Sequence, residues 1–186
     1  MVKALVVMDM SKGEMKNVDN PKKIIKNQVK LVTEFKKHNL PVILVGGSSP
    51  KKYKKNPVMI RLWGEEFKDD PEGINIVPEL LKFKYDLALS KPEYDVFYNT
   101  DFEKYCKKKK IDEIYFTGIY SGCCVYFSSA GAAIRAIQPY LVEDATGSPR
   151  KNMVNKGWHK DTLERYKLMI GPVISTKQVI KELVKK

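Results

Sequence analysis

The chain has 186 residues, enough to bury a sizeable core, and its composition of 43% hydrophobic and 30% charged residues excludes a disordered or fibrous protein. The formal net charge of +12 is compatible with nucleic-acid binding, but arginine occurs only at positions 61, 135, 150 and 165, so the basic residues are nearly all lysines. Because base and phosphate recognition favours the planar arginine fork, we expect a solvated lysine-rich surface and no nucleic-acid partner.

Segments typical of strands and helices alternate along the chain. The apolar spacing predicts, in chain order, a strand over 4–10, a helix over 21–39, a strand over 39–47, a helix over 77–84, a strand over 86–91, a helix over 100–110, a strand over 113–120, a helix over 123–137, a strand over 139–146, a helix over 158–170, a strand over 171–176 and a helix over 177–186. Asn20 is expected to cap the first of these helices, with Pro21 in its first turn, and Thr100 to cap the helix over 100–110.

This alternation is typical of a parallel sheet with helices on both faces. We therefore predict one α/β domain over residues 1–186, a three-layer α/β/α structure around a central, mainly parallel sheet of about six strands. The long stretch from Gly46 to Asn75, rich in Gly, Pro, Ser and Lys, is expected to form a lid or an interface segment.

The cysteines and the first apolar run indicate a compartment. The run VKALVVMDM is too short for a membrane span, and no cleavage pattern follows it, so we expect a cytoplasmic protein with no membrane partner. Cys106, Cys123 and Cys124 are the three cysteines, an odd number that argues against a disulfide framework.

Three reactive residue types follow predicted strands. Asp9 ends the first strand, Lys91 ends the strand over 86–91, and Cys123 and Cys124 follow the strand over 113–120. Because ligands of parallel sheets bind outside the carboxyl ends of the strands, we expect these side chains to share one edge. A cysteine at a helix start, beside an ammonium, is expected to have a lowered pKa, and a carboxylate could move its proton. Each residue alone could equally be a core, turn or solvated residue.

The motifs around these residues resemble those of the isochorismatase-like cysteine hydrolase superfamily, which includes nicotinamidases and N-carbamoylsarcosine amidases. The resemblance lies in ALVVMDM, in DPEGINIVPEL and in LSKPEYDVFYNTDFEKYCKKKKIDEIYFTGIYSGCCV, and it extends over nearly the whole chain in the same order. It implies the isochorismatase-like hydrolase fold and a catalytic triad of Asp9, Lys91 and Cys124.

The nucleophile turn of that superfamily usually reads Gly, two small or apolar residues, Thr, Asp, any residue, Cys, Val. Here the turn reads GIYSGCCV, which makes Cys124 the nucleophile and Cys123 the variable position, expected to point away from the site. Ser121 replaces the usual Thr, Gly122 replaces the usual Asp, and Tyr120 is bulkier than the usual residue. These departures concern the floor of the substrate pocket.

The resemblance also implies a cis peptide between Ile119 and Tyr120, and an oxyanion hole formed by the backbone N–H groups of Tyr120 and Cys124. The implied reaction is acyl transfer: Cys124 attacks a carbonyl, Asp9 carries the proton to the leaving amine, Lys91 stabilises the two anions, and water hydrolyses the thioester.

Histidine content narrows the choice within the superfamily. Nicotinamidases hold a metal through an Asp and two His after the second strand, whereas LVGGSSPKKYKKNPVMIRLWG contains neither residue type, and the chain has only His38 and His159. We therefore expect no metal and no cofactor. An amidase acting on a small amide or N-carbamoyl compound, like N-carbamoylsarcosine amidase, is favoured. The alternatives are a vinyl-ether hydrolase of the isochorismatase type, which can dispense with the cysteine, a nicotinamidase without the usual metal site, and a non-catalytic binding protein.

The walls of the substrate pocket are expected to come from Arg61, Trp63, Phe97 and Tyr120. Arg61 could pair with a substrate carboxylate or be solvated, Trp63 could form a wall or pack within the loop, and Phe97 could equally be a core residue. The apolar residues of YKKNPVMIRLW and the resemblance favour a homo-oligomer, a homodimer or homotetramer, with a small molecule as the substrate.

Overall fold

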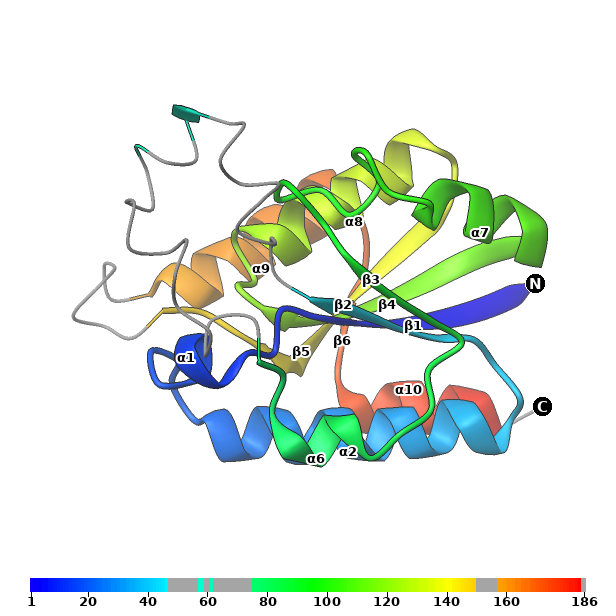
Figure 1. Cartoon of the computed structure of the whole chain (residues 1–186), viewed down its shortest axis with the longest axis horizontal. Helices are drawn as coiled ribbons and strands as arrows, with labels where there is room; N and C mark the ends of the chain where they lie inside the picture. The colour runs from blue at the N-terminus through cyan, green and yellow to red at the C-terminus, as the bar shows by residue number, and fades with distance from the viewer. Residues whose placement is uncertain (47–56, 59–60, 62–74, 150–156, 185–186) are drawn as a thin grey trace.

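A six-stranded, entirely parallel sheet in the order β3-β2-β1-β4-β5-β6 lies at the centre of the molecule (Figure 1). The computed structural model describes residues 1–46, 57–58, 61, 75–149 and 157–184. The strands are β1 Val2–Met8, β2 Val42–Gly46, β3 Leu87–Ser90, β4 Ile111–Ile119, β5 Gln138–Gly147 and β6 Val173–Ile174.

Helices cover both faces of this sheet, which confirms the predicted three-layer α/β/α fold. In Figure 1, α2, α6 and α10 lie below the sheet, and α7, α8 and α9 lie above it. The helices are α1 Lys12–Met15, α2 Pro21–Lys37, α6 Pro78–Leu81, α7 Phe102–Lys109, α8 Cys124–Ile134, α9 Trp158–Met169 and α10 Thr176–Val184. No described helix is both long enough and apolar enough to cross a membrane.

The side chains of β1 show how the two layers form. Successive strand residues point to opposite faces, so Leu5 and Val7 pack with Phe35 of α2, whereas Val6 and Met8 join the core beneath α8. All of them are fully buried. Because both faces are covered, residues 4–8 of the strand form a continuous apolar run without polar alternation.

Asn20 occupies the N-cap of α2 and Pro21 opens the helix, as predicted, but Asn20 has a left-handed φ of 55° and its side chain makes no capping hydrogen bond. Two other local features differ from the prediction. Asp101, rather than Thr100, occupies the N-cap of α7, and the Thr100 hydroxyl accepts a hydrogen bond from the N–H of Phe102 (3.2 Å). The one-turn helix α1 was not predicted. Most of the stretch from 46 to 75, and with it the predicted lid, lies outside the described residues.

The chain changes direction across the sheet between β1 and β4. It runs from β1 outwards through β2 to β3 and then returns to the other side of β1 for β4, β5 and β6. This arrangement puts the topological switch point between β1 and β4, where open α/β sheets bind their ligands at the carboxyl ends of the strands.

Candidate active site

Asp9 follows β1 directly and lies at this switch point. Its backbone N–H donates to the carbonyl of Val45 (2.9 Å), and its own carbonyl accepts from the N–H of Ser11 (2.9 Å). Its φ of 54° is in the left-handed region, which Asp tolerates better than most residues. The residue is only 9% exposed, and its Oδ1 has no hydrogen-bond partner within the described part of the chain. An acceptor oxygen is therefore held, unused, inside the site.

Lys91 brings the site together from the far side of β2. It follows β3, is 3% exposed, and places its Nζ 2.9 Å from Asp9 Oδ2 and 3.2 Å from Cys124 Sγ. Burial alone would lower the pKa of Lys91, but the charges and hydrogen bonds of Asp9 and Cys124 outweigh burial and raise that pKa. The side chain is consequently a fixed positive charge between a carboxylate and a sulfur.

Cys124 lies beside Lys91 because the chain turns after the end of β4. Gly118 has a φ of 112°, and a Cβ there would lie 2.0 Å from the carbonyl oxygen of Met8. Only glycine therefore allows β4 to approach the end of β1 so closely. Next to it, the register between β4 and β5 shifts between Phe116 and Gly118. The chain then turns, and Cys124 opens α8.

Cys123 and Cys124 lie side by side at the start of α8. Cys123 packs with the core on the α2 face and Cys124 with the core on the α8 face, so the expectation that Cys123 points away from the site stays a prediction. Cys123 is the N-cap of α8, and its backbone, with φ −130° and ψ −107°, is not helical. The hydrogen bond from Cys124, together with the charge of Lys91, lowers the pKa of Cys123.

The pKa of Cys124 moves in the opposite direction. The hydrogen bond with Cys123 and burial raise it, and Asp9 adds to this, against the effect of Lys91. An ammonium beside the thiol is thus not enough to lower the pKa of Cys124, because the hydrogen bond with Cys123 and burial outweigh its effect. The pKa values of the two adjacent thiols are therefore shifted in opposite directions, and the protonation of one affects that of the other.

The backbone of the turn from 119 to 124 contains a cis peptide bond between Ile119 and Tyr120. The N–H of Ser121 donates to the carbonyl of Gly147 (2.7 Å) and that of Cys123 to the carbonyl of Tyr120 (3.0 Å). In the described part of the chain the N–H of Tyr120 has no backbone partner. It is therefore available to an acceptor that is not part of the fold.

The predicted pocket residues lie in different environments. The Tyr120 ring is buried on the α2 face, and its hydroxyl donates to the carboxylate of Glu14 in α1. Phe97 is buried against Phe102, with the guanidinium of Arg135 4.5 Å above its ring. Arg61 is exposed, and Trp63 lies outside the described residues.

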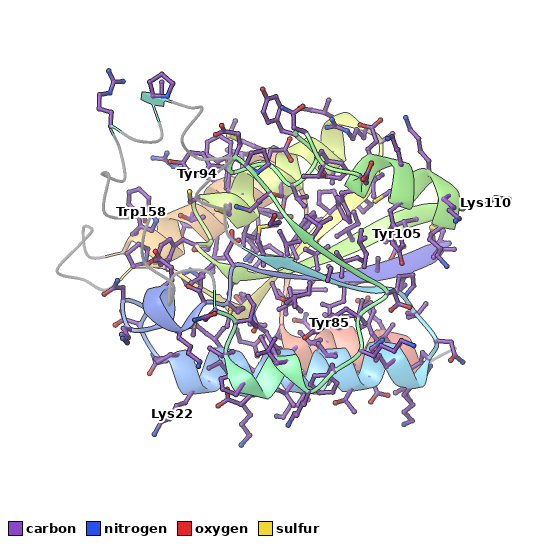
Figure 2. The ribbon with its side chains drawn as sticks, viewed as in Figure 1. Lys22, Tyr85, Tyr94, Tyr105, Lys110 and Trp158 are labelled. Carbon is purple, nitrogen blue, oxygen red and sulfur yellow. The ribbon has the colours of Figure 1, made fainter. Side chains whose placement is uncertain are left out.

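The first turn of α9 packs against the nucleophile turn, a contact that the sequence analysis missed. Ser121 Oγ lies 2.9 Å from His159 Nδ1. A Cβ on Gly122 would lie 2.8 Å from Trp158 Nε1 and 2.9 Å from Thr162 Oγ1. Trp158 lies at the start of α9, at the end of the molecule towards which β1 runs (Figure 2). No local pattern relates α9 to a turn so far back in the chain; the only signal was the unusual glycine at position 122.

Metal ligands do not gather in the described residues: no three His, Cys, Asp or Glu side chains there are arranged to hold a metal ion. His38 contacts Glu34 within α2 (3.2 Å), and His159 contacts Ser121. The two histidines of the chain thus belong to two separate local structures.

Comparisons with known proteins identify the family. Residues 3–178 match the isochorismatase domain. Enterobactin synthase component B of Escherichia coli (strain K12) is 26% identical over 148 residues, which are 76% of this chain and 51% of that protein, so the chain spans about half the length of this relative. The uncharacterized isochorismatase family protein YwoC of Bacillus subtilis (strain 168) is 26% identical over 148 residues, 76% of each chain.

Solved structures agree with this match. N-carbamoylsarcosine amidase from Thermoplasma acidophilum superposes with a TM-score of 0.77 at 27% identity, over 95% of this chain and 97% of that one. A cysteine hydrolase from Pseudomonas syringae pv. phaseolicola has a TM-score of 0.87 at 18% identity, over 98% and 92% of the two chains, a likeness of fold. The chain therefore belongs to the isochorismatase family, whose members are hydrolases.

Proposed function

We propose that the protein hydrolyses a C–N bond, in an amide or N-carbamoyl compound, through a thioester on Cys124. The observation that supports this most directly is the position of Lys91 Nζ, 2.9 Å from Asp9 Oδ2 and 3.2 Å from Cys124 Sγ. A buried ammonium between a carboxylate and a thiol holds a general base and a nucleophile within reach of one substrate carbonyl.

In the proposed reaction Cys124 Sγ forms a bond to the substrate carbonyl carbon while the thiol proton passes to Asp9. The carbonyl oxygen becomes an oxyanion, which the N–H groups of Tyr120 and Cys124 would stabilise. The C–N bond then breaks, and Asp9 returns the proton to the leaving nitrogen. Water attacks the thioester carbon and gives a proton to Asp9, the C–S bond breaks, and Asp9 returns that proton to the sulfur, so that Cys124 leaves as the thiol and Asp9 is again a carboxylate.

Lys91 supports this cycle through its charge. Each anion that forms, the Asp9 carboxylate or the Cys124 thiolate, lies next to an ammonium whose raised pKa keeps it protonated at neutral pH. Because Lys91 is 3% exposed, little solvent screens these interactions. The unpaired Oδ1 of Asp9 is the acceptor that the proton transfer needs.

The substrate class is supported by the resemblance and by one solved relative. One solved relative, at 27% identity and almost full mutual coverage, is named an N-carbamoylsarcosine amidase, a name that describes cleavage of a C–N bond. The competing candidate is vinyl-ether hydrolysis. A probable isochorismatase of Pseudomonas chlororaphis is 23% identical over 84% of this chain. The presence of Cys124, in contact with Lys91, favours C–N cleavage, because an ether hydrolysis can proceed by protonation alone.

An ammonia-release assay across small amides, ureido acids and nicotinamide tests the proposal, with isochorismate cleavage measured in parallel. We expect release from at least one amide or ureido compound, and a loss of turnover of at least ~10³-fold in Cys124→Ala with unchanged thermal unfolding. Cys106→Ala is the matched control. Cys106 is buried in α7, and burial raises the pKa of its thiol to about 12, so it should be inert. Ammonia release that survives in Cys124→Ala would contradict the mechanism, and isochorismate cleavage without ammonia release would favour the alternative.

A further inference from the structure

The nucleophile turn is attached to the fold at two points through one residue. Ser121 is fully buried, its N–H donates to the carbonyl of Gly147 at the end of β5 (2.7 Å), and its hydroxyl lies 2.9 Å from His159 Nδ1 in the first turn of α9. Ser121 is only three residues before Cys124. Any displacement of its side chain would therefore move the backbone that carries both thiols.

His159 is in the right charge state to accept this hydrogen bond. Burial lowers the pKa of His159, and a backbone hydrogen bond to Glu143 acts in the opposite sense. The imidazole is therefore neutral at neutral pH. A neutral ring donates through one nitrogen and accepts through the other. In the tautomer protonated at Nε2, Nδ1 accepts the hydroxyl proton of Ser121, 2.9 Å away.

Gly122 gives α9 the room to make this contact. A side chain at this position would enter the space of Trp158 Nε1 and Thr162 Oγ1, at 2.8 and 2.9 Å from its Cβ. The first turn of α9 thus takes the place that a residue-122 side chain would occupy. The superfamily pattern usually has Asp at this position, so the close docking of α9 accompanies a change in the motif itself.

We propose that His159 is a positioning residue: by holding Ser121, it sets the distance between the Cys123–Cys124 pair and the ammonium of Lys91. The inference rests on the proposed function, because it concerns the same nucleophile. Loss of the hydrogen bond lets the turn relax away from the ammonium, now 3.2 Å from Cys124 Sγ. A thiolate farther from that charge forms only at higher pH.

The experiment follows alkylation of the Cys123–Cys124 pair by iodoacetamide, located by mass spectrometry, between about pH 5 and pH 10. In His159→Ala we expect the pH midpoint of labelling to rise by about one unit, so that labelling at neutral pH is about tenfold slower, the scale of one lost buried hydrogen bond. His159→Asn should restore the wild-type midpoint, because the Asn Oδ1 can take the place of Nδ1 as an acceptor. His38→Ala, at the end of α2, is the matched control and should label as the wild type does.

Two further variants keep the test decisive if His159→Ala is unstable. Ser121→Ala removes one oxygen and should give the same shift, and Ser121→Ala with His159→Ala should shift the midpoint no further than either change alone. An unchanged midpoint in Ser121→Ala, or equal shifts in His159→Ala and His159→Asn, would overturn the positioning role while leaving the proposed function intact. If the wild-type pair instead labels no faster than Cys106, the proposed function itself fails, and the inference fails with it.

Discussion

Gly122→Ala is the most informative single change at the candidate site. Gly122 stands where the superfamily motif usually has Asp, and the structure gives a steric reason for the glycine. The new Cβ would lie 2.8 Å from Trp158 Nε1, 2.9 Å from Thr162 Oγ1 and 3.3 Å from Trp158 Cε2. The first turn of α9 must therefore move before even the smallest side chain fits.

The expected cost follows from these distances. To reach 3.4 Å, where ordinary van der Waals contact begins, the Trp158 nitrogen must retreat by about 0.6 Å. Overpacking a well-packed site in this way costs about 1–3 kcal/mol. Replacing glycine by alanine also lowers the conformational entropy of the unfolded chain, which stabilises the folded state by about 0.4–1 kcal/mol. We therefore expect the free energy of unfolding to fall by about 1–2 kcal/mol, with a decrease in Tm of about 2–8 °C for a chain of this size.

Urea denaturation and thermal unfolding measure this loss, and another glycine provides the control. Gly46 ends β2, and a Cβ there would meet only the carbonyl oxygen of Leu89, at 3.8 Å. Gly46→Ala should be neutral or stabilising by up to about 1 kcal/mol. Trp158→Ala in the Gly122→Ala background should recover part of the loss, because two of the three close atoms disappear. Thr162 remains, so recovery should be incomplete.

Two outcomes would refute the steric explanation. One is a Gly122→Ala variant as stable as Gly46→Ala. The other is strict additivity of Gly122→Ala and Trp158→Ala, because residues that truly compete for one space must show a coupling of about 0.5 kcal/mol or more. Trp158 is 42% exposed, so its own removal should cost little. Its side chain also has some freedom to yield, which is why the expected loss is not larger.

Two further predictions concern charged side chains. Asp9→Asn leaves the ammonium of Lys91 buried without its carboxylate, so the free energy of unfolding, measured by urea denaturation, should fall by about 3 kcal/mol. Adding Lys91→Met should restore most of this loss. An Asp9→Asn variant as stable as the wild type would contradict the prediction. Hydrogen bonds from Lys107 and Arg135 lower the pKa of Glu103 to about 2. The stabilisation from Glu103 is thus present above its unfolded pKa of about 4.3 and is lost as the pH falls towards about 2. The stability difference between wild type and Glu103→Gln should disappear in acid, and a difference that persists there would contradict the assignment.

The sheet and its reactive edge were predictable because they follow from patterns that are local in the sequence. Apolar runs indicate the strands, and the residue after a strand lies at the carboxyl edge of a parallel sheet. Asp9 and Lys91 directly follow β1 and β3, and Cys124 opens the helix that comes after β4. Topology alone therefore puts them on one edge, although the strand order, with β2 between β1 and β3, becomes known only from the structure.

Conformations of single residues were less predictable, because tertiary contacts outweigh intrinsic preference. Asn20 is a good capping residue by type, yet its left-handed backbone prevents its side chain from capping α2. That Tyr120 lines the substrate pocket stays a prediction, but the partner of its hydroxyl could not be predicted from the motif. In the structure its hydroxyl is bound to Glu14 of α1, a helix too short to give a periodic signal.

The contact between α9 and the nucleophile turn could not be predicted for a different reason. A periodic pattern gives the existence of a helix but not its docking position, which depends on the side chains of every element that it meets. Position 122 was recognised as unusual because the superfamily motif has another residue there. Only the three-dimensional structure shows that Gly122 lies against Trp158 and Thr162.

The charges around Cys124 differ most from what the sequence led us to expect. An ammonium beside a cysteine was expected to produce a standing thiolate, but Lys91 contacts two potential anions, Asp9 and Cys124, and holds only one positive charge. Two negative groups around one cation leave one negative charge uncompensated in a buried space, so one group retains or regains a proton. The raised pKa of Cys124 and the unpaired Oδ1 of Asp9 fit this arrangement. Under the proposed function, a proton passes between Cys124 and Asp9 while Lys91 keeps its own, as acyl transfer to and from a cysteine requires.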